Sequence, residues 1–439
     1  MARDRLRTLA EVLEVVRPAF TRPSFERFVA LVRGWLLAER AGPVTSALVG
    51  AGIAGRQHHE AFHRFFSRGT WSVDEVGTQL LRWIASHAAS DGSLQLAIDD
   101  TVAKKKGPKL FGLGTHLDPV RSTRRVRNFV FGHLWVVLVA IIKVPFSNRR
   151  WAVPIFFRLY RQERDCARTN DPYRKRTELA RELIELASCV VPALKLHVSA
   201  DAAYCCETVL RNLPSNVIVY GTLRDNAVLT SAPPAAVRRR AGRPRVRGER
   251  LPTPAQLAAN SSRWRTVHAS LYGVGRKLSI KQMDAQWYQG RGPEVLRVVV
   301  VRLTTGKLPH RVYFCTDPSR SPTEIVERYT ARWQIEVCFR DLKQHLGFGA
   351  GPARSRNAVE RVTPFAAYVY SLTVLWARTA LRRVDRAPRI KRPWYRDKVG
   401  LSFADLLHVA RRDVLDLGMR SGRAKNSTRL GNLAVARAA

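Results

Sequence analysis

Four polar residues within 15 positions could act on phosphate groups. They lie between Tyr329 and Lys343 in the stretch YTARWQIEVCFRDLK, which has no Gly or Pro and predicts one amphipathic helix. At about 100° per residue, Tyr329, Arg332, Glu336 and Lys343 share a narrow face of that helix. A carboxylate beside two cations and a phenol suits metal-dependent phosphoryl transfer. A surface helix with i,i+4 ion pairs, such as Arg332 with Glu336, is the alternative from spacing alone.

Further acidic residues follow two predicted strands upstream. The apolar residues 94–98 lead into Asp99 and Asp100, and a short strand expected over residues 194–199 leads to Asp201. Carboxylates at the ends of two strands and one on a later helix could converge on a pair of Mg²⁺ ions, because this ion prefers hard oxygen ligands. Two such ions about 4 Å apart can activate an attacking water and stabilise a leaving 3′ oxygen. No nucleophilic side chain is needed.

The charge of the chain narrows the class of partner. Its 439 residues are enough for two or three domains, and 75 Lys and Arg against 35 Asp and Glu give a formal net charge of +40. Such a surface attracts a polyanion, so we expect double-stranded DNA. Lipid headgroups are the competing polyanion. However, the longest apolar run, residues 129–142, is too short to span a bilayer and predicts a buried strand.

The N-terminus and the cysteines indicate a reducing compartment. Residues 1–16 carry acids and lack an uninterrupted apolar segment, so we expect no signal peptide. None of the six cysteines belongs to a Cys-x-x-Cys pair, which argues against a disulfide framework and a structural zinc site. We therefore expect a cytoplasmic protein that is not associated with a membrane.

One short motif suggests a different chemistry. His59, Glu60 and His63 match His-Glu-x-x-His, the helical zinc pair and general base of metalloproteases. His58 makes this patch rich in histidine, where such a match arises by chance, and no downstream Gly-x-x-His extends it. A net charge of +40 has no role in proteolysis, so a zinc metalloprotease is only a remote alternative.

The order of expected elements divides the chain into four regions. A helical N-terminal DNA-binding domain comes first, an α/β core follows in two segments, a β-rich insertion with a basic loop separates those segments, and a basic tail with a short helix ends the chain. In that order the regions are residues 1–90, 91–220 with 318–383, 221–317 and 384–439. Two short helices in the first region, at 44–51 and 58–66, are compatible with a helix-turn-helix or with a plain helical bundle.

Two features of the insertion could contact DNA. The sequence Gly-Arg-Pro-Arg, with Arg243 and Arg245, resembles the centre of an AT-hook, which lies in a narrow minor groove. A solvated basic loop has the same composition. Trp287 lies on a turn-flanked strand, where an aromatic ring could stack on an unpaired base, although core packing is the more common fate of tryptophan.

The four polar residues of the first stretch also carry a family resemblance. They fit Tyr-x2-Arg-x3-Glu-x6-Lys without departure, which resembles the signature of one branch of bacterial insertion-sequence transposases, the YREK branch, in the DDE (Asp-Asp-Glu) superfamily. Asp-x-Thr at 99–101, Asp201 before Ala-Ala-Tyr and the β-rich insertion match in order over residues 94–345. The resemblance implies an α/β, RNase H-like catalytic core with a mixed sheet flanked by helices, interrupted by the insertion and preceded by a helical domain.

The resemblance also implies a metal site. Asp99, Asp201 and Glu336 would be the catalytic residues and would hold two Mg²⁺ ions, for which Mn²⁺ can substitute. Asp100 is an alternative to Asp99, because adjacent residues of a strand point to opposite faces. The Asp-x-Thr pattern favours Asp99.

The remaining residues of the resemblance would bind DNA. Tyr329, Arg332 and Lys343 would contact phosphates at the transposon end, and Trp287 would hold a flipped base. The implied function is cut-and-paste transposition, in which a homodimer in a synaptic complex cleaves inverted-repeat ends and joins them to target DNA in the bacterial cytoplasm, at the nucleoid. A DNA-binding protein derived from a transposase but no longer catalytic is the alternative.

Overall fold

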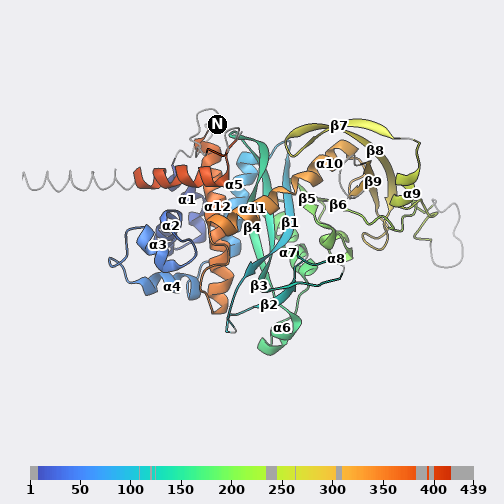
Figure 1. Cartoon of the computed structure of the whole chain (residues 1–439). Helices are drawn as coiled ribbons and strands as arrows, with labels where there is room; N and C mark the ends of the chain where they lie inside the picture. Colours follow the sequence, from blue (N-terminus) through green and yellow to red (C-terminus); the bar gives the residue numbers. More distant parts are fainter. Residues whose placement is uncertain are drawn as a thin grey trace, which may run out of the picture. The chain divides into compact units, whose positions relative to one another are not determined.

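The computed structural model describes residues 8–107, 109–118, 121–123, 125–233, 245–262, 264–302, 309–381, 393–394 and 400–416. The chain divides into two compact units. We call Met1–Ser72, Pro145–Ser147 and Asp341–Ala439 the helical unit, and Val73–Val144 with Asn148–Arg340 the sheet unit. The elements of both are labelled in Figure 1. Among the described residues, none of the helices is long and apolar enough to cross a membrane.

Large aromatic side chains form much of the core of the helical unit. Its helices are α1 (Leu9–Leu13), the 3-10 helix η1 (Glu14–Ala19), α2 (Arg22–Leu37), α3 (Val44–Gly50), α4 (His59–Ser67), α12 (Arg356–Ala380) and a helix over 403–416. The ring of Phe365 on α12 lies 5.2 Å from that of Phe66 on α4 and 5.5 Å from that of Phe28 on α2, between centroids. These buried rings hold α12 among the N-terminal helices (Figure 1). The two short helices predicted at 44–51 and 58–66 are present as α3 and α4.

The described strands form one 10-stranded mixed sheet. They are β1 (Ser93–Lys104), β2 (Gly114–Leu117), β3 (Phe129–Val144), β4 (Ser147–Tyr160), β5 (Lys195–Ala200), β6 (Val217–Thr222), β7 (Arg265–Leu271), β8 (Val274–Gln286), β9 (Val295–Arg302) and β10 (His310–Cys315). Their order is β2-β3-β1-β5-β6-β10-β9-β8-β7, with β4 on β3. The neighbours β1, β5 and β6 run parallel, and the other described pairings are antiparallel. The predicted class, a mixed sheet flanked by helices, is confirmed.

Helices cover both faces of this sheet. The helices of the sheet unit are α5 (Val73–Ala88), α6 (Glu163–Thr169), α7 (Arg176–Val190), α8 (Glu207–Leu210), α9 (Pro254–Ala259), α10 (Pro322–Ala331) and the first part of α11 (Gln334–His345). Arg158 of β4 binds Asp74 of α5 and Glu182 of α7, which joins these two helices to one face. The carbonyl of Arg328 in α10 accepts hydrogen bonds from Gln95 and Ser199 on the other face.

The first strand differs from its expectation. The apolar run was expected to end at the carboxylates, but β1 continues through Asp99 and Asp100 as far as Lys104. The two acids pair with Val137 and Val136 of the long strand β3. A complete backbone ladder with that neighbour outweighs the low strand propensity of aspartate. The prediction that the strand ends at Asp99 is therefore wrong.

The structure of the stretch from Tyr329 to Lys343 also differs from the predicted one. Helix α10 ends at Ala331 and α11 begins at Gln334, so the prediction of one continuous helix is wrong. Around the break, the N–H groups of Trp333, Ile335 and Glu336 each bond to the carbonyl three residues earlier, as in a 3-10 turn. The contacts of Arg332 described below hold this turn, and local sequence without Gly or Pro does not reveal such contacts.

The strands expected between residues 221 and 317 are present as β7 to β10. They extend the same sheet, because β10 pairs with β6. Under them lies an apolar cluster that includes Tyr220, Val299, Tyr313, Ile325 and Tyr329. This cluster fixes α10 against the sheet and so fixes the position from which the chain turns into α11.

Candidate active site

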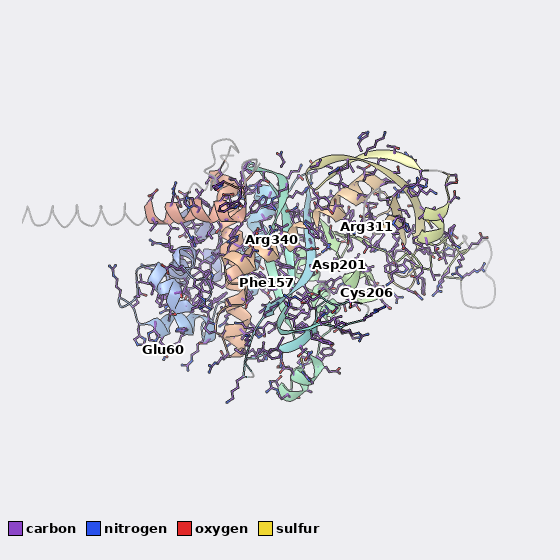
Figure 2. All side chains as sticks on the ribbon, viewed as in Figure 1. Glu60, Phe157, Asp201, Cys206, Arg311 and Arg340 are labelled. Carbon is purple, nitrogen blue, oxygen red and sulfur yellow. The ribbon has the colours of Figure 1, made fainter. Side chains whose placement is uncertain are left out.

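Parallel pairing places the first two predicted acids side by side. In the register of β1 with β5, Ile98 lies opposite Ala200, the last residue of β5. The next residue on each chain is Asp99 and Asp201. Asp201 therefore leaves the sheet beside Asp99, which remains within β1; Asp201 is labelled in Figure 2. Asp201 lies here because β5 ends at Ala200, after the buried residues Leu196 and Val198.

One guanidinium joins all three predicted acids. Nη1 of Arg332 lies 2.5 Å from Oδ2 of Asp99, and its Nη2 lies 3.1 Å from Oε1 of Glu336 and 3.8 Å from Oδ1 of Asp201. The turn between α10 and α11 brings Arg332 and Glu336 to this end of the parallel strands. The structure thus gathers Asp99, Asp201 and Glu336 around Arg332, within the sheet unit.

The electrostatics of the site depend on burial. Burial raises the pKa of the Asp99 carboxyl to about 7, against the opposing effects of Arg332 and of the Asp100 N–H, which donates to Oδ1 of Asp99. Burial lowers the pKa of Arg332, but the electrostatic effects of its neighbours, led by Asp99, together outweigh burial and leave this pKa above its usual range. Nε of Arg332 is buried and has no hydrogen-bond partner among the described residues. Arg332 therefore remains a cation with donor capacity to spare.

The three carboxylates are chemically suited to a hard divalent cation, although they are not arranged as the ligands of one. Three carboxylates supply the oxygen ligands that Mg²⁺ prefers. In the part of the chain that the structure describes, however, no group of three or more His, Cys, Asp or Glu side chains is placed to hold a metal ion. The three acids face the guanidinium of Arg332 instead of a common point. The guanidinium therefore contacts carboxylate oxygens that a metal ion would also use.

Asp100 points away from this cluster. Its Oδ2 accepts hydrogen bonds from the Tyr204 hydroxyl at 2.6 Å and from Nη1 of Arg176 at 3.0 Å. Alternation along β1 is the cause, because neighbouring residues face opposite sides of the sheet. Burial, followed by the charge of Asp100, raises the pKa of Tyr204 well above its usual range, so Tyr204 is a hydrogen-bond donor. Arg176 was not among the predicted site residues, because its position at the start of α7 carries no motif of its own.

Two of the residues expected to bind phosphate lie in different surroundings. Tyr329 is buried in the apolar cluster, with its ring 4.9 Å from that of Tyr313. Lys343 lies on α11, seven residues beyond Glu336, in the part of that helix that belongs to the helical unit. The structure therefore brings Arg332 to the three acids and places Tyr329 behind it.

A cavity of about 640 Å³ lies beside Asp201. We call it the tryptophan cavity, because Trp287 lines it together with Ala202, Ala203, Cys206, Thr222 and Arg224. The ring of Trp287 makes an edge contact with Phe314, at 5.8 Å between centroids, and is partly exposed. One end of this ring is thus packed, while the rest faces a space next to the acids. Cys206 is labelled near Asp201 in Figure 2.

The other predicted site residues are not part of this cluster. Arg243 is outside the described residues, and Arg245 is exposed. His59, Glu60 and His63 are all exposed on α4, and Glu60 pairs with Arg64. The rings of His59 and His63 lie 5.9 Å apart in an edge arrangement, and among the described residues these side chains do not form a metal-binding group. Figure 2 labels Glu60 on this helix.

Comparison with known proteins identifies the family. The family described as "DDE superfamily endonuclease" matches residues 15–293, which include Asp99, Asp201 and Trp287 and end before Arg332. A solved structure titled "Cryo-EM structure of piggyBac transposase synaptic complex with hairpin DNA (SNHP)" is similar at 11% identity, with a TM-score of 0.41, over 94% of this chain and 78% of that chain. No curated protein matches. Because the family match covers more than half of its residues, the chain belongs to the DDE superfamily endonucleases.

Proposed function

We propose that this chain is a DNA transposase of a bacterial insertion sequence, of the branch with the Tyr-Arg-Glu-Lys signature. It binds the inverted-repeat ends of its element, hydrolyses phosphodiesters there and joins the freed 3′ hydroxyls to target DNA. The observation that carries the proposal is the meeting of Asp99, Asp201 and Glu336 on one guanidinium at the end of a parallel strand pair. Membership of an endonuclease family supports the same chemistry.

The three acids are the catalytic residues of this proposal. Enzymes of the DDE superfamily generally use divalent metal ions. Asp99, Asp201 and Glu336 would hold two Mg²⁺ ions, or Mn²⁺ in their place, and the bound ions would supply activation of the attacking oxygen and stabilisation of the leaving one. Asp99 lies on β1 and Asp201 directly follows the neighbouring strand β5, whereas Glu336 comes from α11, so the strands and the helix hold the donors from two sides.

Arg332 has two partners in this proposal. It neutralises the three acids, and its planar guanidinium is suited to bind a phosphate oxygen of the transposon end. When a phosphate takes the guanidinium, the carboxylates are released for metal binding. Lys343 would contact a phosphate of the transposon end. Tyr329 would act through its position behind Arg332, because its ring is buried.

The tryptophan cavity suits an extrahelical base. Trp287 presents part of an aromatic ring to a space directly beside Asp201, and stacking on an aromatic ring does not depend on the identity of the base. A flipped base at Trp287 would fix the position of the adjoining phosphate at the acids. The cationic surface would bind the rest of the duplex, and two ends handled together require a homodimer. We place the protein in the bacterial cytoplasm, at the nucleoid.

The test is cleavage of a duplex that carries the element's own end. Wild-type protein should nick it with Mg²⁺ and not with EDTA. Glu336→Gln should bind the duplex within about twofold of wild type and lose nicking, because the ligand is lost while the cations remain. Glu163→Gln, an exposed acid on α6, is the matched control and should nick at the wild-type rate. Binding by the wild type without any nicking would instead identify a non-catalytic DNA-binding protein.

A further inference from the structure

A second cavity adjoins the same site on the other face of the sheet. Its volume is about 270 Å³, and its lining includes Tyr160, Tyr173, Tyr204, Lys175, Arg176 and Ala203. We call it the tyrosine cavity. Its lining residues come from the end of β4, the segment before α7, the first residues of α7 and the turn after Asp201. The described activity of the three acids makes no use of it.

The lining of this cavity has the chemistry of a nucleotide site. The rings of Tyr160 and Tyr173 lie edge to face at 6.4 Å, and their hydroxyl oxygens are 3.3 Å apart. Two aromatic rings held in this way offer a platform for a base. Lys175 and Arg176, next to the rings, offer cations for the phosphate of the same nucleotide. The side chain of Tyr173 is exposed, so this platform is accessible to solvent.

Asp100 connects the tyrosine cavity to the candidate active site. Arg176 and Tyr204, which line the cavity, both bond to Asp100, the residue after Asp99 in β1. The charge of Asp100 holds Arg176 in place and partly neutralises it. A ligand that contacts Arg176 or Tyr204 in the cavity therefore contacts a side chain that is bonded to Asp100, the sequence neighbour of Asp99.

The turn after β5 separates the two cavities. Ala203 lines both the tyrosine cavity and the tryptophan cavity, and Asp201 precedes it by two residues. A nucleic-acid strand that crosses Asp201 thus has an aromatic cavity on each side of it. One is lined by Trp287, and the other is lined by Tyr160 and Tyr173.

We propose that the tyrosine cavity binds the nucleotide on the opposite side of the scissile phosphate from the nucleotide held at Trp287. This inference rests on the proposed function. Together the two cavities hold the strand at two points, so that the phosphate between them is fixed at the acids. Tyr173 and Tyr160 bind the base, and Lys175 and Arg176 bind its phosphate.

Photo-crosslinking tests which nucleotide each cavity holds. The probe is the element's end duplex with a single 5-iododeoxyuridine, moved one position at a time across the scissile bond and bound to Glu336→Gln to prevent cleavage. Crosslinks to Tyr160 or Tyr173 should arise only from one side of that bond, and crosslinks to Trp287 only from the other. Crosslinks to Trp287 without any to either tyrosine would overturn the tyrosine-cavity proposal and leave the proposed function standing. A wild type that fails to nick the duplex would overturn both.

Matched variants test whether the base contact contributes to affinity. Tyr173→Ala should weaken binding of the end duplex about tenfold, while Tyr173→Phe, which keeps the ring, should stay within twofold of wild type. An abasic residue at the crosslinked position should weaken wild-type binding by the same factor and should not weaken Tyr173→Ala further. Tyr272→Ala, an exposed tyrosine on the turn between β7 and β8, is the control. If the losses of affinity caused by the abasic residue and by Tyr173→Ala simply add, the proposed contact between Tyr173 and the base is wrong.

Discussion

Nη1 of Arg332 lies 2.5 Å from Oδ2 of Asp99, although 233 residues separate them in the chain. The same guanidinium also reaches Glu336 and Asp201. A divalent cation and Arg332 therefore compete for the same oxygens. Stability without metal and affinity for metal are opposed properties of this cluster, and each can be measured.

Removing Arg332 should expose this competition. In EDTA, Arg332→Gln should lower the free energy of unfolding by roughly 3 kcal/mol, because it leaves the buried Asp99 without its cation. The partly exposed Asp201 and Glu336 add little, since water screens them. Mg²⁺ should then stabilise the variant more than it stabilises the wild type. Urea unfolding in EDTA and in MgCl₂ measures both effects.

Arg297→Gln is the matched control for that experiment. Arg297 binds Asp284 through two parallel hydrogen bonds on β9 and β8, and these residues make no contact with the candidate active site. Its loss should destabilise the protein equally in EDTA and in MgCl₂. A Mg²⁺ effect of the same size in Arg332→Gln and in the wild type would contradict the competition.

The two adjacent aspartates should respond differently to loss of charge. Asp99→Asn should lower the rate of Mg²⁺-dependent nicking by roughly 10³, which corresponds to several kcal/mol of lost charge stabilisation. Asp100→Asn should lower it by only about 10- to 100-fold, because Asp100 acts by positioning Arg176 and Tyr204. Single-turnover nicking rates separate the two. Equal losses would mean that Asp100 also binds metal.

Stability should fall between pH 6.5 and pH 4 through a buried histidine on β3. Burial lowers the pKa of His133 to about 4, although its Nε2 bonds to the Phe111 carbonyl. The folded state thus favours the neutral ring, and its contribution is complete above pH 6.5 and is lost as the pH falls toward 4. At pH 5 the loss is about 2 kcal/mol relative to pH 7.5. Urea unfolding at the two pH values should show a smaller loss in His133→Gln, whereas His268→Gln, at an exposed site on β7, should behave as the wild type.

DNA binding should weaken steeply with salt, because each phosphate that the protein neutralises releases counterions. We expect Arg243 and Arg245 each to contact a phosphate. The slope of the logarithm of the binding constant against the logarithm of the salt concentration should therefore become shallower by roughly 1 in Arg243→Ala and in Arg245→Ala. Both variants should also lose preference for A·T-rich duplexes. Fluorescence anisotropy at several salt concentrations measures both. An unchanged slope would show that these arginines belong to a solvated loop.

The sequence predicted the positions of the acids better than their surroundings. Asp201 follows a short strand that was expected over residues 194–199, so its place after β5 was predictable. Asp99 could be preferred to Asp100 only by a motif, because alternation shows that two neighbours face opposite sides but not which side holds the site. Which of the two aspartates lies beside Asp201 depends on the pairing of β1 with β5, a strand that starts about a hundred residues after β1.

Long-range contacts explain what the sequence did not reveal. The break between α10 and α11 has no Gly or Pro to mark it, and the partner that holds Arg332 there is 233 residues away. The burial of Tyr329 depends on Tyr313, a residue of β10 that the sequence places on a different element. Arg176 has no pattern of its own, because its role comes only from its contact with Asp100.

The separation of Asp99 and Arg332 also sets when the site can form. A ribosome that adds about 5–20 residues per second releases Arg332 roughly 10–50 s after Asp99. Until then the nascent chain can pair β1 with β3 and β5, but it has neither Glu336 nor the cation that holds the acids together. Under the proposed function, a fragment that ends before Arg332 lacks both Arg332 and Glu336 and should therefore not nick the end duplex.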